Sequence, residues 1–297
     1  MSVLFLTESD VESLIDMPAS IEAVERAFVA VADGSAVNVP RARAKAPGFL
    51  LHSMSATAEY LGLAGWKNYT TTSQGARFHV AAYELDSGRM LALIQANRLG
   101  QLRTGAASGV ATRHLARPDA NVLGLLGTGW QAESQLEAVA SVRPLEVVRV
   151  HSRDPERRRG FAEAMSQRLQ LDVQAVDSAE AAVDGADIVS TATTSKAPLF
   201  EGQLLMPGSH LNIIGSNHLS KAESDVESIA SADMVVCDRI DQCRIEAGEL
   251  AAASEAGGWK WEDAIELADI VAGTRPGRTG DTQRTVFKSV GLAVEDV

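Results

Sequence analysis

A glycine-containing turn is the clearest chemical signal in the sequence. Residues 127–132 read Gly-Thr-Gly-Trp-Gln-Ala, which fits the G-x-G-x-x-G/A pattern. The turn follows the apolar run NVLGLL and opens a stretch with helical periodicity, the context in which this pattern holds a dinucleotide. The first glycine permits the tight turn, the second lets the backbone approach the pyrophosphate, and the small last residue allows close helix–strand packing. A structural turn without ligand is the alternative. The residues assigned to cofactor binding are Gly127, Thr128, Gly129, Trp130 and Gln131.

The end of the next predicted strand bears on which nucleotide is bound. It reads VHSRDPERRR, so Ser152 and Arg153 occupy the tip and Asp154 follows late. An acidic residue at this tip would accept hydrogen bonds from the ribose hydroxyls of NAD, whereas a hydroxyl and a guanidinium suit a 2′-phosphate. Arg157, one turn further on, adds positive charge unless it belongs to a solvated helix face. The pattern favours NADP(H), with NAD(H) as the alternative cofactor.

Strands and helices alternate from about residue 121 onward. Apolar runs such as NVLGLLG, LEVVRVHS, LDVQAV and DIVSTAT are separated by helical stretches such as QAESQLEAVASV and DPERRRGFAEAMSQRL. Alternation of this kind is typical of a parallel sheet with helices on both faces. The sequence therefore predicts an α/β fold with a Rossmann-type, doubly wound parallel sheet.

The first third of the chain has a different pattern. Residues 7–34 have helical spacing, with Thr7 as N-cap and Gly34 as the stop. Residues 37–96 hold short runs typical of antiparallel strands, including the hairpin turn ELDSGRM, and residues 100–116 are Ala-rich and helical. These features predict an α+β N-terminal domain. We place its boundary near Arg117-Pro118-Asp119, so that residues 1–116 plus about 285–297 form one domain and residues 117–284 the Rossmann domain.

Composition restricts the class of protein. The 297 residues are 45% hydrophobic and carry a net charge of −12, which argues against nucleic acid or anionic lipid as a partner. No apolar run is long enough for a signal peptide or a membrane span. Cys237 and Cys243 have no His or Cys partners at zinc-like spacing, so we expect no metal site and two reduced thiols in a cytoplasmic protein.

Several separate motifs, in order along nearly the whole chain, resemble the ornithine cyclodeaminase and mu-crystallin family. They are VPRAR at 39–43, GWK at 65–67, LRTGAAS at 102–108 with LARPDA at 115–120, GTGWQA at 127–132, IGSN at 214–217 and FKSVGLAVEDV at 287–297. The resemblance implies a homodimer whose N-terminal domain supplies the dimer contact and the substrate site. It implies a Rossmann domain that supplies the nicotinamide.

The resemblance also implies roles for individual side chains. Arg41 and Arg103 match arginines that would clamp a substrate carboxylate, with Arg43 as the rival of Arg41. Lys67 matches the lysine of the G-x-K motif and would polarise an imine or exchange protons, its pKa lowered by an apolar setting. Thr104 either touches the cofactor phosphate or caps a helix.

Two positions depart from the cyclodeaminases that the sequence resembles. His52 stands where they have a glutamate, and Asn217 stands where they have an aspartate. Asn cannot act as a base, and His is a different acid–base group. His52 is either a proton donor or, as a lone histidine more often is, a satisfied structural group. Glu246 and Glu249 lie at helical spacing, which favours a solvated helix face over an acid–base pair.

These departures favour an NAD(P)H-dependent reductase of an α-imino acid. Its substrate would be pyrroline-2-carboxylate, piperideine-2-carboxylate, or a 2-oxo acid with ammonia. One alternative is an ornithine cyclodeaminase-type lyase with tightly bound NAD. Another is a non-catalytic nucleotide-binding protein resembling mu-crystallin.

Overall fold

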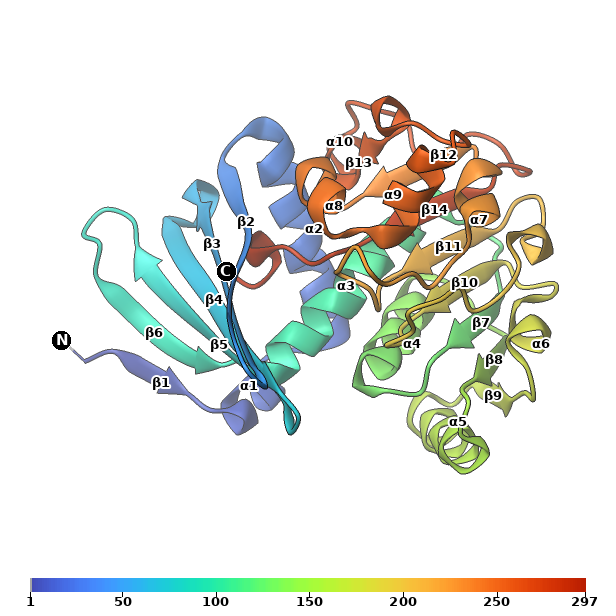
Figure 1. Cartoon of the computed structure of the whole chain (residues 1–297). Coiled ribbons are helices and arrows are strands. Elements are labelled where there is room, and N and C mark those ends of the chain that lie inside the picture. Colours follow the sequence, from blue (N-terminus) through green and yellow to red (C-terminus); the bar gives the residue numbers. More distant parts are fainter. Residues whose placement is uncertain (1) are drawn as a thin grey trace.

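The protein has two lobes, each built on its own sheet (Figure 1). The computed structural model describes residues 2–297. The N-terminal lobe holds a six-stranded sheet in the order β1-β6-β5-β4-β3-β2, and the second lobe holds an eight-stranded sheet in the order β13-β12-β14-β11-β10-β7-β8-β9. None of the helices within residues 2–297 is both long and apolar enough to cross a bilayer.

The N-terminal lobe is an antiparallel sheet with one parallel edge strand and a helical layer. Its elements are β1 (Leu4–Leu6), α1 (Glu8–Leu14), α2 (Met17–Asp33), β2 (Ala36–Ala46), β3 (Phe49–Ala58), β4 (Leu63–Thr72), β5 (Gly75–Glu84), β6 (Met90–Gln95) and α3 (Asn97–Leu115). Thr7 caps α1 in a capping box with Asp10. The predicted helical region divides at Asp16, because Asp16 caps a new helix whose second residue is Pro18. The edge strand β1 pairs with β6 and was not predicted.

The second lobe is the predicted Rossmann-type fold, and its strands are parallel. Its elements are β7 (Val122–Leu126), α4 (Trp130–Val142), β8 (Val147–His151), α5 (Pro155–Leu169), β9 (Asp172–Ala175), α6 (Ala179–Val183), β10 (Ile188–Thr191), β11 (His210–Ile213), α7 (Val226–Ala230), β12 (Met234–Cys237), α8 (Ile240–Glu246), α9 (Gly248–Glu255), β13 (Ile265–Glu266), α10 (Leu267–Val271) and β14 (Thr285–Lys288). The strand order reverses at β7, between β8 and β10. Ligands of such sheets bind at the carboxyl ends of the strands around this reversal.

The C-terminal segment returns to the first lobe later than the sequence predicts. Residues 285–288 form β14, which lies between β11 and β12 inside the eight-stranded sheet, so the expected return from about Thr285 is wrong for these residues. All four residues of β14 are buried, which suits a central parallel strand. Only the last residues, with a 3₁₀ turn at Ala293–Glu295, pack against β2, β3 and β4.

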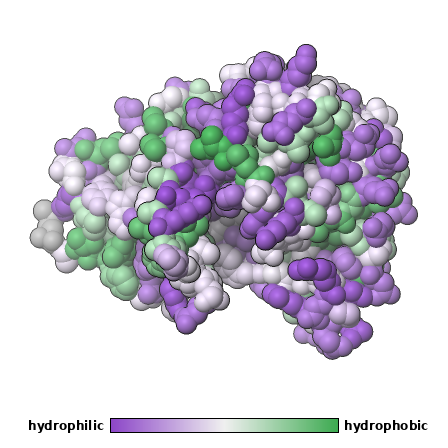
Figure 2. All heavy atoms as spheres, viewed as in Figure 1, coloured by the Kyte–Doolittle hydropathy of each residue, from purple (hydrophilic) through white to green (hydrophobic). Residues whose placement is uncertain are grey.

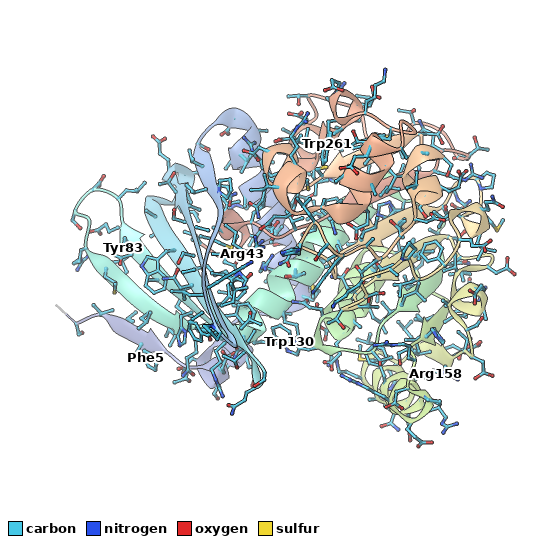
Figure 3. All side chains as sticks on the ribbon, viewed as in Figure 1. Phe5, Arg43, Tyr83, Trp130, Arg158 and Trp261 are labelled. Atoms are coloured by element: carbon cyan, nitrogen blue, oxygen red, sulfur yellow. The ribbon has the colours of Figure 1, made fainter. Side chains whose placement is uncertain are left out.

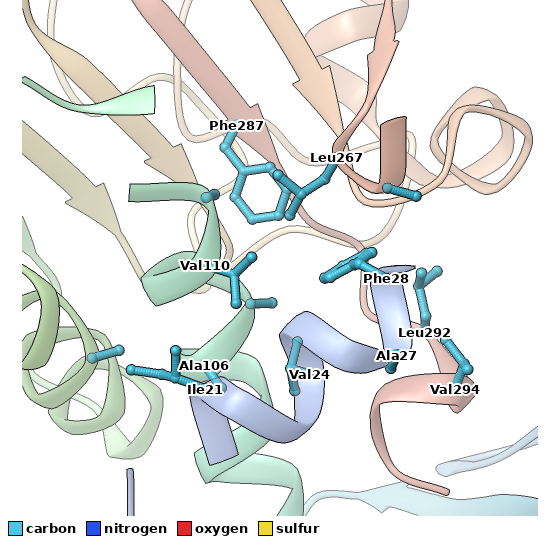
Figure 4. Packing of buried hydrophobic residues seen from close by; sticks show 14 of the residues in the cluster. Ile21, Val24, Ala27, Phe28, Ala106, Val110, Leu267, Phe287, Leu292 and Val294 are labelled. Carbon is cyan, nitrogen blue, oxygen red and sulfur yellow. The ribbon is translucent and has the colours of Figure 1, made fainter. Parts of the chain in front are cut away.

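Helices α2 and α3 join the two lobes through one hydrophobic core (Figure 4). Ile21 and Phe28 of α2 and Val110 of α3 lie in the same buried cluster as Leu267 and Phe287 of the second lobe. Small residues let α3 approach α4 closely: a Cβ on Gly105 would lie 2.4 Å from the backbone oxygen of Ser134. The shared core fixes the position of one sheet relative to the other, and hence the shape of any site between them.

Candidate active site

A cavity of about 880 Å³ lies between the two lobes. Figure 2 shows the surface hollowed between the lobes, and Figure 3 shows Arg43 and Trp130 at their junction. The cavity reaches the carboxyl ends of β7, β8, β10 and β11, where the strand order reverses. Its position brings residues of the predicted cofactor loop and the predicted substrate cations into one site.

The glycine turn forms one wall of this cavity as predicted for a dinucleotide loop. Gly127 has φ +119°, and a Cβ there would lie 2.4 Å from the backbone oxygen of Ala192, so only glycine fits. A Cβ on Gly129 would meet open space, which leaves room for a ligand against the backbone. Helix α4 begins at Trp130 and directs its first N–H groups toward this space. The loop therefore fits the pyrophosphate of a dinucleotide.

The tip of β8 presents cationic and hydroxyl groups to the cavity. Ser152 accepts a 3.0 Å hydrogen bond from the Thr128 hydroxyl, and Arg153 and Arg157 line the cavity with exposed side chains. The Asp154 carboxylate accepts hydrogen bonds from the backbone of Glu156 and Arg157, so it serves as the cap of α5. A carboxylate engaged in this way is less available to ribose hydroxyls.

Three cations from three different elements form the opposite wall. Arg41 of β2, Lys67 of β4 and Arg103 of α3 all line the cavity. Arg103 lies two turns inside α3, and Thr104 beside it donates its hydroxyl to the Gly100 carbonyl at 2.7 Å. The helix-cap interpretation of Thr104 is therefore wrong, because the residue lies in the interior of α3. Thr104 also lines the cavity.

A layer of carboxylates stands behind these cations. Glu246 of α8 forms ion pairs with Arg41 and Arg43, while Asp296 accepts hydrogen bonds of 2.7 and 2.8 Å from the Lys67 ammonium. Glu295 accepts a 2.8 Å hydrogen bond from Arg103. We define these three residues, Glu246, Glu295 and Asp296, as the carboxylate layer. All three are buried, and none lines the cavity.

The carboxylate layer corrects the sequence-based interpretation of α8 and α9. Glu246 and Glu249 are both buried, so the predicted solvated helix face is wrong. Glu249 lies 3.5 Å from the ammonium of Lys288, which is itself fully buried. Buried carboxylates need such partners, because desolvation of an unpaired charge costs several kcal/mol. Their cations lie far away in sequence, so helical spacing alone could not reveal them.

The two positions that depart from the cyclodeaminase pattern differ in their placement. Asn217 lines the cavity, and its backbone oxygen accepts a 3.0 Å hydrogen bond from Arg43. His52 is buried behind Tyr69 and does not line the cavity. Burial, assisted by Arg43 and Arg41, lowers the pKa of His52 to about 4, so the ring is neutral at pH 7. This placement favours the structural interpretation of His52 over a role as proton donor.

Sequence reasoning missed a stacked aromatic series of which three members line the cavity. His52, Tyr69, Phe78 and Trp130 stack in succession, with ring centroids 3.9, 4.7 and 6.2 Å apart. The Lys67 ammonium lies 5.2 Å from the centre of the Phe78 ring. The sequence signal was the alternation in β4, which places Tyr69 on the same face as Lys67.

Glu223, also missed, fixes two loops of the cavity wall. Its carboxylate accepts 2.6 Å hydrogen bonds from the backbone N–H groups of Thr193 and Gly215, which follow β10 and β11. Both of these residues line the cavity, whereas Glu223 is fully buried behind them. No local sequence pattern signals this role, because it depends on contacts between separate loops.

Comparison with known proteins decides the family. The model of the ornithine cyclodeaminase/mu-crystallin family matches residues 1–297. The chain belongs to this family. Among family members, the Δ(1)-pyrroline-2-carboxylate reductase of Bacillus cereus is 32% identical, over 99% of this chain and 94% of that protein.

Solved structures of family members share the whole fold. The Δ(1)-pyrroline-2-carboxylate reductase of Thermococcus litoralis, in complex with NADH and L-proline, matches with a TM-score of 0.95 and 33% identity, over 99% of this chain and 94% of that one. An archaeal alanine dehydrogenase dimer with bound NAD matches with a TM-score of 0.93 and 31% identity, over 100% and 93% of the two chains. The similarity to these structures therefore extends over both lobes.

We expect imine turnover to fall above about pH 8. Burial and the neighbouring Arg103 lower the pKa of Lys67 to about 8 against the opposing effect of Asp296, so the ammonium form is lost as the pH rises through that value. The test is the pH profile of kcat/KM for the wild-type protein and for the residual activity of Lys67→Met. A fall of kcat/KM at high pH that arises from the substrate's own ionisation would appear in both profiles. If the fall persists in Lys67→Met, deprotonation of Lys67 is not its cause.

Proposed function

We propose that this protein is an NAD(P)H-dependent reductase of α-imino acids. The substrate would be a ketimine such as pyrroline-2-carboxylate or piperideine-2-carboxylate, or a 2-oxo acid with ammonia, and the product an amino acid. The observation that carries the proposal is one cavity lined both by the Gly127–Gln131 loop and by Arg41, Lys67 and Arg103. Relatives named as Δ(1)-pyrroline-2-carboxylate reductases, over nearly the whole chain, support it.

The two walls of the cavity serve different parts of such a reaction. Reduced nicotinamide, when bound, supplies a hydride for the imine carbon. Arg41 and Arg103 hold the substrate carboxylate, and Lys67 provides the proton for the nitrogen. The carboxylate layer keeps these cations in place from behind, while the aromatic rings of Tyr69 and Phe78 exclude water.

Turnover assays separate the reductase from the lyase. The protein is mixed with NADPH or NADH and a panel of cyclic imino acids and 2-oxo acids with ammonia, and nicotinamide absorbance is recorded. In parallel it receives ornithine with a catalytic amount of NAD, and ammonia is measured. We expect stoichiometric loss of reduced cofactor with an imine. Ammonia release from ornithine without net cofactor consumption would overturn the proposal. The cavity offers little for that lyase, since Asp154 is the acidic residue among its described lining residues.

We further propose that NADP(H) is preferred over NAD(H). Removing the two guanidinium groups with Arg153→Ala and Arg157→Ala together should raise KM for NADPH by about tenfold or more and leave KM for NADH nearly unchanged. Arg159→Ala is the matched control, because Arg159 lies on the same helix, pairs with Glu156 and does not line the cavity. Equal effects on both cofactors, or lower KM for NADH than for NADPH in the wild type, would contradict the preference.

A homodimer is proposed as the assembly. The archaeal alanine dehydrogenase is a dimer, and the edge strand β1 exposes Leu4 and Phe5, at 61% and 56% of their surface. Sedimentation equilibrium tests this, with a monomer at micromolar concentration as the contrary result.

The buried thiols of Cys237 and Cys243, both free, support the cytoplasmic location predicted from the sequence.

A further inference from the structure

Tyr69 is a buried side chain whose hydroxyl no protein group uses. Only 8% of the residue is exposed, and it lines the cavity on the same face of β4 as Lys67. Its hydroxyl makes no hydrogen bond to any group within residues 2–297. The hydroxyl oxygen is not among the fully buried atoms that lack a partner, so it is accessible from the cavity. A hydroxyl that lines the cavity without a protein partner is available to a ligand there.

The Tyr69 ring is held in a fixed position. It stacks on His52 at 3.9 Å with an interplanar angle of 5°, and on Phe78 at 4.7 Å. His52 is itself held by a 3.2 Å contact between its Nε2 and the Thr71 hydroxyl. This arrangement gives His52 a role that the sequence did not predict, because it fixes the ring that faces the cavity. The Tyr69 hydroxyl is thus preorganised, and little conformational freedom is lost when it binds a ligand.

A cation beside the Tyr69 ring indicates which ligand group meets this hydroxyl. The Arg41 guanidinium carbon lies 5.9 Å from the centre of the Tyr69 ring. The terminal nitrogens of Arg41 are engaged by Glu246 and by the carbonyls of Val290 and Gly291, whereas its Nε has no hydrogen-bond partner among the described residues. A carboxylate has two oxygens and can accept from both donors, the Arg41 Nε and the Tyr69 hydroxyl.

The protonation state of Tyr69 suits donation to an anion. Burial raises the pKa of the phenol, and the effect outweighs the opposing influence of Arg41 and Arg43. The hydroxyl therefore keeps its proton through the neutral range and adds a hydrogen bond without adding charge. The Lys67 ammonium lies over the neighbouring Phe78 ring, so the two residues serve different ends of a small ligand.

We propose that the Tyr69 hydroxyl donates a hydrogen bond to the carboxylate of the imino acid, beside Arg41, and is thus a substrate-binding residue. This inference rests on the proposed reductase function. It assigns the carboxylate to the Arg41–Tyr69 side of the cavity and leaves the imine nitrogen to Lys67. Arg41 and Tyr69 would then bind the negative charge of the substrate, and Lys67 would transfer the proton.

Tyr69→Phe tests the assignment, because it removes only the hydroxyl. We expect KM for the imino acid to rise about 10- to 100-fold, the range for a lost hydrogen bond to a charged group, with kcat changed by less than about threefold. The melting temperature should stay unchanged, since the hydroxyl bonds no protein group. Tyr83→Phe is the matched control: it removes a hydroxyl that accepts a 3.1 Å hydrogen bond from Trp66 outside the cavity, and its KM should match the wild type.

A binding measurement gives a second readout without turnover. Pyrrole-2-carboxylate and pyrrole-2-carboxamide share a planar ring and differ in the anionic group. With cofactor present, Tyr69→Phe should weaken binding of the carboxylate about tenfold and of the carboxamide much less. If Tyr69→Phe binds each compound as tightly as the wild type does, the proposal is overturned. A large fall in kcat at unchanged KM would also overturn it and would make Tyr69 the proton donor instead. If the wild type reduces no imine, the proposed function fails. The comparison of carboxylate and carboxamide binding still tests whether Tyr69 recognises a carboxylate.

Discussion

Replacing Lys67 with methionine should lower imine turnover by about 10²- to 10⁴-fold while cofactor binding persists. The loss is that of a positioned acid–base group. Lys67 is 1% exposed, both of its Asp296 contacts lie on the side of the carboxylate layer, and its ammonium faces the Phe78 ring at the cavity wall. Methionine keeps the length of the side chain without its charge. The cofactor loop lies on a different element, so it should be unaffected.

Single-turnover oxidation of NADPH and a fluorescence titration of NADPH measure the two quantities separately. In Lys67→Met, the buried Asp296 carboxylate keeps one cationic neighbour, the Arg103 Nε at 3.3 Å. Loss of its partner can destabilise the fold, which is a second cause of lost activity to be separated from the loss of the proton donor. The double variant Lys67→Met with Asp296→Asn removes that unpaired charge and should be more stable but equally inactive. Turnover of Lys67→Met within about threefold of the wild type would contradict the catalytic role. Recovery of turnover in the double variant would show that the loss arises from the unpaired carboxylate.

Glu246→Ala should be the most destabilising substitution in the carboxylate layer. It leaves Arg41 buried and Arg43 partly buried without their carboxylate, and removal of one partner from a buried ion pair typically costs about 3–5 kcal/mol. Glu246 also accepts a 3.0 Å hydrogen bond from Gln242. Since Arg41 loses the group that holds it, KM for the imino acid should rise as well.

Urea unfolding and steady-state kinetics test this expectation. Glu156→Ala is the control, because Glu156 pairs with Arg159 on the surface with an 85% exposed side chain, and its stability should change by less than about 0.5 kcal/mol. Glu246→Gln keeps the shape and one acceptor, so its loss of stability should fall between the two. If Glu246→Ala unfolds at the wild-type urea concentration with an unchanged KM, the carboxylate layer does not position the cations.

Local sequence patterns were sufficient for the β7–β10 part of the second lobe and for the cofactor loop. The alternation of apolar runs and helical stretches after residue 121 predicts the parallel sheet, because β7 and β8 are short, largely apolar and each followed by a helix. Gly127 could be assigned from its place between strand and helix, and the structure gives it a positive φ and no room for a side chain. Such features depend on residues that are adjacent in the chain.

Features that depend on distant partners were not accessible in this way. Glu246 pairs with arginines about two hundred positions earlier, so its helical spacing was compatible with a solvent-exposed face as much as with a buried one. β14 enters the middle of the sheet, although it is the last strand in the chain, and a strand of only four residues, Thr-Val-Phe-Lys, does not reveal its neighbours. His52 was expected at the site from its position relative to Met54, yet its side chain stacks behind Tyr69.

Transfer of deuterium from labelled cofactor to product tests the proposed function most directly. The protein would be supplied with pyrroline-2-carboxylate and, in turn, with each of the two NADPH stereoisomers deuterated at C4 of the nicotinamide. The account predicts that one isomer delivers its deuterium to the α-carbon of proline, one for each NADPH oxidised, and that the other delivers none. Proline without deuterium at the α-carbon from either isomer, or no proline at all while ornithine is deaminated without net loss of cofactor, would contradict it.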